Sequence, residues 1–208
     1  MDKLRQELSS LHIEKALDIA TRDGAFAKEM YAGFGSCKEI VALDRFDKMF
    51  EKGREKCADM PVNFVIGDAC HMDFEDNTFD VVISRNLTWN LEHPDVAYRE
   101  WVRVLKVGGR LLNFDANYGA TNFAETSGLP ENHAHNQLGN SLMQECEDIK
   151  RQLPISSYLR PAWDVEELGK TGMEQISIDL GLSRRVYKEK DEFYNPTPMF
   201  AIAAKKAK

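Results

Sequence analysis

Three aspartates stand at the ends of three successive apolar segments of the chain. Asp18 lies in LDIATRDGAF (residues 17–26), Asp44 ends EIVALD, and Asp68 follows Gly67. If these segments are parallel strands, their carboxyl ends meet at the crevice where open α/β sheets bind ligands. A carboxylate at Asp44 suits ribose hydroxyls, and one at Asp68 suits an adenine amino group. Each aspartate alone is also a common turn residue, but the ordered set predicts a nucleoside-binding site.

The turn after the first apolar segment is the second part of this predicted site. Ala20, Thr21 and Gly24 are small residues, which let the backbone approach a ligand at a helix N-terminus. Arg22 adds bulk to the same turn. Its side chain either turns outward or pairs through its guanidinium with an anionic group of the ligand.

Strands and helices must alternate to bring these residues together. Apolar runs predict strands at 15–20, 39–44, 61–66, 79–84 and 110–115. Helical patterns follow at 25–32, from the cap Asp47 to about 58, and from Pro94 to the turn at Gly108 and Gly109. The spacing of Leu4, Leu8 and Leu11 predicts one more helix at the N-terminus. This alternation is typical of an α/β fold with a parallel sheet and helices on both faces.

The chain changes character after Asp115. Residues 116–163 are rich in Asn, Gly, His and Pro and contain no clear strand. Ser141 and Gln144 form a capping box that opens a helix to about residue 153. The apolar stripe of that helix comprises Met143, Cys146, Ile149 and Leu153. Because so long a segment in a compact domain is usually a lid or a binding element, we expect a lid-like insertion. An ordered surface insertion or an oligomer contact is the alternative.

The last part of the chain predicts a helix and a hairpin. Asp164 and Glu167 open a short helix, and strands are expected at 174–180 and 199–204. With no helix expected between them, these two strands form an antiparallel pair. Tyr194 and Asn195 precede the last strand and are interpreted as its turn.

Four segments together resemble the class I S-adenosylmethionine-dependent methyltransferases that act on small molecules. They read LDIATRDGAFA, IVALDRF, VIGDACHMDFEDNTFDVVIS and WVRVLKVGGRLLNFD, and the last is close to the RVLKPGGRL that is usual in that family. The resemblance implies a doubly wound, Rossmann-like, seven-stranded sheet with an antiparallel last strand, in a single domain over residues 1–208. The family usually has glycine where this chain has Ala20 and Arg22.

The same resemblance assigns residues to the two parts of the site. The implied contacts to S-adenosylmethionine come from Asp18, Ala20, Thr21, Arg22, Gly24, Asp44, Arg45, Asp68, Ala69, Ser84, Arg85 and Asn86. The candidates for the acceptor pocket are Trp89, Asn90, Asn117, Tyr118 and His133. The alternative interpretation of Trp89 is simple packing of its side chain, with no contact to the acceptor. A solvated loop is the preferred interpretation of His133 and His135, with general-base catalysis as the alternative. No residue is assigned a catalytic role.

Composition and missing motifs narrow the function. The net charge is −7, and the chain carries no long apolar run and no signal-peptide core, so we expect no nucleic acid, no membrane and a cytoplasmic protein. The four cysteines are scattered, which favours free thiols and no metal site. There is no Pro-Pro-aromatic motif after the fourth strand, no Pro-Cys pair and no GxGxxG, which speaks against methylation of base amino groups, cytosine C5 methylation and a nicotinamide enzyme.

We therefore expect methyl transfer from S-adenosylmethionine to a small-molecule acceptor, by in-line displacement in a closed pocket. Three alternatives remain open. The first is a cofactor-binding module without catalysis, which Arg22 and the short segment before the first strand keep in play. The second is a methyltransferase that acts on protein or RNA. The third is aminopropyl transfer from a decarboxylated cofactor. A homodimer also remains open.

Overall fold

The computed structural model describes residues 12–34, 37–125, 129–133, 136, 138–192 and 194–207. The helix expected around Leu4, Leu8 and Leu11 lies outside these residues, as does His135. Within the described ranges, no helix is long and apolar enough to cross a membrane.

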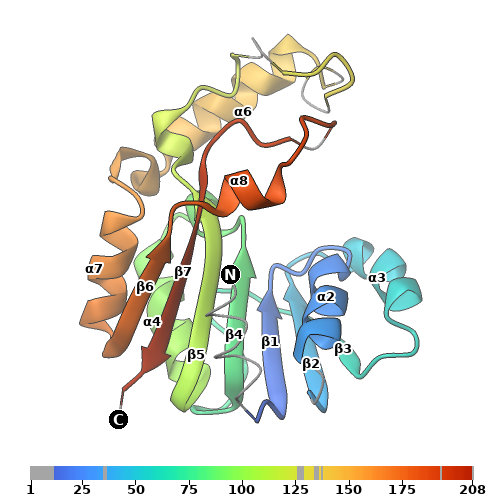
Figure 1. Ribbon diagram of the computed structural model, residues 1–208, viewed down its shortest axis with the longest axis vertical. Helices are drawn as coiled ribbons and strands as arrows, with labels where there is room; N and C mark the ends of the chain where they lie inside the picture. The colour runs from blue at the N-terminus through green and yellow to red at the C-terminus, as the bar shows by residue number, and fades with distance from the viewer. Residues whose placement is uncertain are drawn as a thin grey trace.

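A single seven-stranded sheet forms the centre of the fold (Figure 1). Its strands are β1 (Lys15–Ile19), β2 (Glu39–Asp44), β3 (Val62–Ile66), β4 (Phe79–Arg85), β5 (Leu105–Ala116), β6 (Met173–Asp179) and β7 (Met199–Lys206). They follow the order β3-β2-β1-β4-β5-β7-β6, and β7 alone runs against its neighbours. The expected doubly wound sheet with a reversed last strand is confirmed.

The inner strands are apolar on both faces because helices cover both faces. Leu17 and Ile19 of β1 pack into the core beneath α4 (Pro94–Val104) and α7 (Ala162–Lys170). Ala16 packs into the opposite core with Ala27 and Met30 of α2 (Ala25–Phe34). A further short helix, α3 (Phe50–Lys56), lies between β2 and β3 in the chain. The strand order reverses beside β1, whose neighbours are β2 and β4, and this reversal places the ligand crevice at their carboxyl ends.

Several expected boundaries are wrong. Gly108 and Gly109 lie inside β5, because the chain already becomes extended at Leu105 and Gly108 takes a left-handed φ of 79° within the strand. Asp47 caps no helix: it begins the short 3-10 helix η1 (Asp47–Met49), which has no side-chain cap. A five-residue helix, α8 (Leu182–Val186), lies between β6 and β7, where no helix was expected.

The described residues of 116–163 rise above the carboxyl end of the sheet, and we call them the lobe (Figure 1). It contains η3 (Tyr118–Ala120), α6 (Asn140–Gln152) and η4 (Pro154–Ser157). The chain between α8 and β7 runs beside the lobe and bonds to it, through Thr197 to Thr121 at 3.0 Å and through Asn195 to the Tyr118 hydroxyl at 2.7 Å. Tyr194 and Asn195 therefore belong to a long loop that packs on the lobe, not to a hairpin turn.

Helix α6 buries a different face from the one predicted. Its buried residues are Met143, Glu147 and Lys150, whereas Ile149 is 52% exposed. Ser141 caps nothing, because the helix begins after Gly139, which has a φ of 79° and no side chain. The polar face turns inward because Glu147 and Lys150 bond to the backbone of the loop below.

Candidate cofactor and acceptor site

The loop between β1 and α2 has left-handed backbone at Gly24 and at the two positions, Ala20 and Arg22, where the resembled family usually has glycine. The φ angles are 59° at Ala20, 57° at Arg22 and 70° at Gly24. A side chain at Gly24 would meet the Phe64 ring at 3.0 Å and the backbone of Gly53 at 3.3 Å. The loop thus keeps a backbone that favours glycine, although alanine and arginine occupy two of the positions.

Asp18 is buried directly beneath this loop. It is 1% exposed, and the Thr21 hydroxyl donates to its Oδ2 at 2.7 Å. Burial raises the pKa of this carboxyl to about 7, against a smaller opposing effect of the Thr21 hydrogen bond. Asp18 is therefore a poorly solvated carboxylate near neutral pH, which favours a cationic ligand group beside it.

Asp44 ends β2 and ties that strand to the loop. Its Oδ2 accepts the backbone N–H of Arg22 at 2.8 Å, and its Oδ1 accepts the N–H of Phe46 at 3.2 Å. The Arg22 side chain is exposed, as in the outward alternative. Each oxygen of Asp44 keeps a second acceptor position, which is what a pair of ribose hydroxyls requires.

The adenine candidates follow β3. Asp68 is half-buried; its Oδ1 accepts the N–H of Cys70 at 2.8 Å, and its Oδ2 lies 3.7 Å from the guanidinium of Arg45. The carbonyl of Ala69 accepts the indole N–H of Trp101 at 2.9 Å, so α4 fixes this turn. Asp18 within β1, Asp44 at the end of β2 and Asp68 just after β3 therefore lie near the carboxyl ends of three parallel strands, at the same edge of the sheet.

The end of β4 supplies the next set. Ser84 is fully buried, and its hydroxyl has no hydrogen-bond partner among the described residues. Arg85 is exposed and its guanidinium lies 5.2 Å from the centre of the Phe26 ring, at the start of α2. Asn86 has a left-handed φ of 52°, which turns the chain toward the 3-10 helix η2 (Thr88–Asn90).

Three aromatic rings gather beside this turn, and we call Trp89, Tyr118 and Phe123 the aromatic wall. The ring centres lie 4.8 Å apart for Trp89 and Tyr118, 5.6 Å for Trp89 and Phe123, and 5.7 Å for Tyr118 and Phe123. The carbonyl of Asn86 accepts the Trp89 indole N–H at 3.1 Å, and its Oδ1 lies 3.4 Å from the Tyr118 hydroxyl. The wall therefore stands at the end of β4, next to the predicted position of the methyl group.

The other acceptor candidates lie in different surroundings. Asn90 is exposed, and its backbone N–H closes η2 onto Leu87 at 2.9 Å. The Oδ1 of Asn117 is buried without a hydrogen-bond partner among the described residues. His133 is buried, and its Nε2 lies 2.7 Å from the carbonyl of Tyr194, so it is not a solvated loop histidine.

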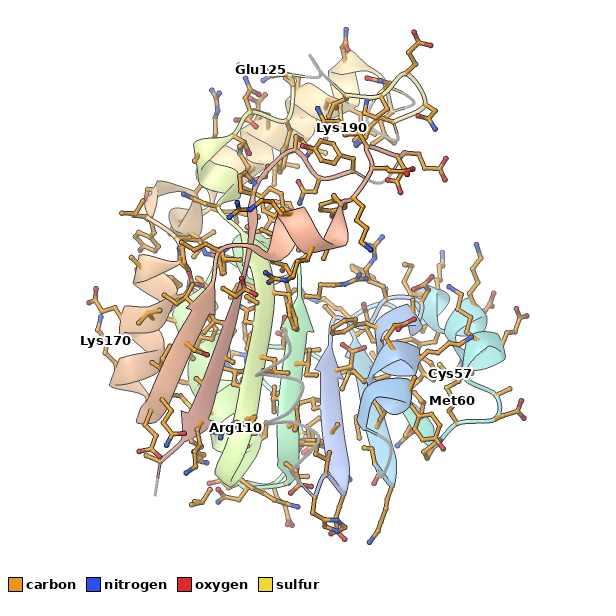
Figure 2. The ribbon with its side chains drawn as sticks, viewed as in Figure 1. Cys57, Met60, Arg110, Glu125, Lys170 and Lys190 are labelled. Atoms are coloured by element: carbon orange, nitrogen blue, oxygen red, sulfur yellow. The ribbon has the colours of Figure 1, made fainter. Side chains whose placement is uncertain are left out.

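Sequence reasoning missed Phe123 and Tyr187. Both pack against a small core of Ala116, Tyr118, Leu182, Met199 and Ala201 at the base of the lobe. An isolated aromatic residue in a loop carries no periodic signal, so only the folded chain reveals this grouping. Lys190 and Glu125, labelled in Figure 2, likewise come from distant parts of the sequence and both lie above the sheet.

A polar cavity of about 670 Å³ lies within the lobe and is bordered by Pro196 of the loop before β7. It is lined by η3, α6 and η4, and by the buried Glu147 and Lys150. These two side chains lie 2.6 Å apart, Lys150 also bonds the carbonyl of Thr121, and Glu147 accepts the N–H of Phe123 at 2.8 Å. The cavity is therefore lined by a satisfied ion pair, and both of its side chains contact Phe123 of the aromatic wall.

Among the described residues, no group of three or more His, Cys, Asp or Glu side chains is placed to hold a metal ion. The donor set fits S-adenosylmethionine instead. The buried carboxylates of Asp18 and Asp44 and the unpartnered hydroxyl of Ser84 lie at the carboxyl ends of β1, β2 and β4, and a left-handed loop leads from β1 to the start of α2. Burial also raises the pKa of the Cys37 and Cys57 thiols, so these cysteines are poor nucleophiles.

Comparison with known proteins agrees with this geometry. A family model described as a methyltransferase domain matches residues 17–113. The ubiquinone/menaquinone biosynthesis C-methyltransferase UbiE of Haemophilus ducreyi is 40% identical over 178 residues, which cover 80% of this chain and 64% of that protein. The same enzyme of Pasteurella multocida is 32% identical over 184 residues, which cover 83% of this chain and 63% of that protein. This chain therefore spans less than two thirds of the length of these relatives.

Solved structures share the fold. Phosphoethanolamine N-methyltransferase 2 of Haemonchus contortus, in complex with S-adenosylmethionine, superimposes with a TM-score of 0.67 at 18% identity, over 98% of this chain and 51% of that one. At that identity the likeness concerns the fold alone. Taken together with the family model and the curated relatives, the sheet order and the loop after β1 lead to one conclusion: this chain belongs to the class I S-adenosylmethionine-dependent methyltransferases.

Proposed function

We propose that this protein transfers a methyl group from S-adenosylmethionine to a ring carbon of a small, quinone-type acceptor. The observation that carries the proposal is the aromatic wall at the end of β4, beside the cofactor loop. The similarity to C-methyltransferases of quinone biosynthesis supports the same acceptor class. The net charge of −7 favours a small molecule over nucleic acid.

In this proposal, S-adenosylmethionine binds to residues at the carboxyl ends of β1 to β4 and just after them. Asp44 would hold the ribose, Arg45, Asp68 and Ala69 would surround the adenine, and Ser84, Arg85 and Asn86 would face the methionine portion. Asp18 and the backbone of residues 20–24 would hold the amino-acid group, since a buried carboxylate favours an ammonium beside it. When bound, S-adenosylmethionine supplies an electrophilic methyl group on its sulfonium.

The acceptor half uses the aromatic wall. Offset and edge-to-face contacts favour a flat ring packed against Trp89 and Phe123. Burial raises the pKa of the Tyr118 hydroxyl, which keeps it protonated and able to donate to an acceptor oxygen. Asn195 donates to that hydroxyl at 2.7 Å and fixes its position. Asn90, Asn117 and His133 stay in the proposal as residues of the surrounding loops.

Methyl transfer from a sulfonium needs little help from acid–base groups of the protein. The cofactor held at the ends of β1 to β4 would supply its methyl carbon, in line and with sulfur leaving as a neutral thioether, to a ring carbon activated by a phenolate oxygen, and the ring proton would pass to water. Placement of the ring and exclusion of water supply most of the effect. The lobe and the loop after α8 are the elements that would close the site.

The direct test offers the protein a simple acceptor of this class. Reduced 1,4-naphthoquinone is incubated with methyl-labelled S-adenosylmethionine under anaerobic conditions, and the product is identified by mass spectrometry. We expect label on the ring carbon, and about tenfold less product with Trp89→Ala. Binding of S-adenosylhomocysteine with no transfer to naphthalenediols, amines or thiols would instead indicate the cofactor-binding module without catalysis.

The role of the lobe has its own test. Replacing residues 120–139 by a short Gly/Ser linker removes Phe123 of the aromatic wall together with the segment that follows it, so Phe123→Ala is the matched comparison for the loss of that ring alone. We expect affinity for S-adenosylhomocysteine to change by only a factor of a few while methyl transfer is lost. Full activity in this variant would contradict the lid, and lost cofactor binding in a folded variant would move this segment to the cofactor site.

A further inference from the structure

A buried polar network lies under the aromatic wall, on the side of β5 that α4 and α7 cover. Arg160, which follows η4, is its centre and is 5% exposed. Its guanidinium lies 3.1 Å from Oδ2 of Asp115 at the end of β5, and 2.6 Å from Oδ1 of Asp164 in α7. Both carboxylates are fully buried. Asp164 is therefore not the helix cap that its spacing predicts, since it belongs to this network.

The same network holds the backbone that carries Trp89. Oδ2 of Asp115, which faces Arg160, also accepts the backbone N–H of Trp89 at 3.0 Å. The neighbouring Thr88 hydroxyl accepts from Nδ2 of Asn113 at 2.9 Å. That amide also donates to the Tyr98 hydroxyl at 2.8 Å, which in turn donates to Asp164 at 2.6 Å. Two adjacent residues of η2 are thus bonded into the network.

Arg160 also joins the two ends of the lobe. Its Nη1 donates to the carbonyl of Ala116 at 3.2 Å, where the lobe leaves β5. Arg160 itself lies where the lobe returns to the body. One planar guanidinium thus reaches both carboxylates and a carbonyl, which a lysine ammonium cannot match from one position.

From these contacts we infer that Arg160 is a positioning residue: through Asp115 it sets the position of Trp89, and with it the wall against which the acceptor ring packs. The kinetic test of this inference rests on the proposed function, whereas the test by fluorine NMR does not. Within the described residues, the network makes no hydrogen bond or ion pair to Asp18, Asp44 or Asp68, and it meets the predicted methionine-binding residues only where Asn113 pairs with Ser84 between β5 and β4 and where the Trp89 indole bonds the carbonyl of Asn86. A variant of Arg160 is therefore expected to disturb the acceptor and to spare the cofactor.

The test uses three variants of the full chain. Arg160→Lys keeps a charge but cannot bond both carboxylates. Thr88→Val is isosteric and breaks the network beside Trp89 while leaving every charge in place. Arg103→Lys is the matched control, because Arg103 bonds Glu100, Asp76 and two backbone carbonyls at the far end of α4.

Fluorine NMR of protein labelled with 5-fluorotryptophan reports on the three indoles separately, and Trp89→Phe assigns the Trp89 signal. We expect the Trp89 signal to shift or broaden in Arg160→Lys and Thr88→Val, and to stay in place in Arg103→Lys. Calorimetry should show affinity for S-adenosylhomocysteine within about twofold of wild type. With reduced 1,4-naphthoquinone as acceptor, kcat/KM should fall about ten- to a hundredfold.

The outcomes separate the two proposals. If the wild type methylates no ring acceptor while the Trp89 signal moves as expected, the proposed function fails and the positioning role stands. An unmoved Trp89 signal in a folded Arg160→Lys protein overturns the positioning role. If Arg160→Lys does not fold, Thr88→Val decides: an unmoved signal and unchanged kcat/KM in that variant also overturn it.

Discussion

The backbone N–H of Arg22 donates to Oδ2 of Asp44 at 2.8 Å, and this bond joins the loop after β1 to the end of β2. Arg22 makes the bond from a left-handed conformation with a φ of 57°. Arg22 stands where the family usually has glycine, yet its backbone N–H still bonds Asp44, the carboxylate predicted to hold the ribose. The bond explains why the loop can accept an arginine: its side chain points away while its N–H keeps its partner.

Replacement of Asp44 tests the predicted ribose contact. Asp44→Ala removes the acceptors for two ribose hydroxyls, so we expect affinity for S-adenosylhomocysteine to fall by about 2–3 kcal/mol, or roughly 30- to 150-fold. Calorimetric titration measures this. Asp47→Ala is the matched control, because Asp47 is an exposed acid three residues further on. Equal affinity in wild type and a folded Asp44→Ala protein would remove the ribose assignment.

The left-handed backbone of Arg22 makes a prediction about stability. A non-glycine residue in this conformation costs about 1–2 kcal/mol, and glycine costs about 0.5–1 kcal/mol in chain entropy, so Arg22→Gly should be more stable than Arg22→Ala by roughly 0.5–1 kcal/mol. Urea denaturation measures the difference. Arg54 in α3 is the control, because it is exposed and helical, and there the order should reverse. If alanine were more stable than glycine at position 22 as well as at position 54, the left-handed backbone of Arg22 would carry no measurable strain.

Burial of Asp18 predicts a pH-dependent stability. Because burial raises its pKa from 3.8 to about 7, the folded protein holds a proton that the unfolded chain has already released. The contribution of Asp18 is therefore favourable at low pH and is lost as the pH rises from about 4 to about 7. Relative to Asp18→Asn, the free energy of unfolding of wild type should fall by about 2–3 kcal/mol between pH 5 and pH 8. Parallel pH profiles for the two proteins would contradict this.

The ion pair between Glu147 and Lys150 predicts how the lobe is held. Both side chains are 2% exposed, and in Lys150→Met the buried Glu147 keeps only the exposed Arg151, whose Nε lies 2.7 Å from Oε1, so we expect the protein to be destabilised by about 2 kcal/mol. Hydrogen exchange should rise in residues 118–125 and in α6. Lys170→Met is the control: its pairs with Glu166 and Glu167 are at the surface, so its effect should stay below about 1 kcal/mol. Similar losses in both variants would mean that burial of the pair does not stabilise the lobe.

The sequence by itself determined the central fold. Strands such as EIVALD are short apolar runs bounded by turn residues, and alternation with helical patterns allows few topologies other than a doubly wound parallel sheet. The same local reading places Asp18, Asp44 and Asp68 at one edge, because parallel strands bring their carboxyl ends together. These inferences succeed because each depends on residues that are close in the chain and on the general rules of sheet topology.

The tertiary structure alone decided the acceptor side. Trp89, Tyr118 and Phe123 come from separate turns, and their grouping depends on how the lobe packs on the body. The buried face of α6 and the role of Asp164 were predicted wrongly for the same reason. Hydrophobic periodicity expects the charged residues of a helix to face solvent, and an aspartate at a helix start is expected to cap it. Here Lys150 and Asp164 are buried because each combines an ion pair within its own turn, to Glu147 or Arg160, with a hydrogen bond to a residue distant in sequence, Thr121 or Tyr98, and no local pattern encodes the distant partner.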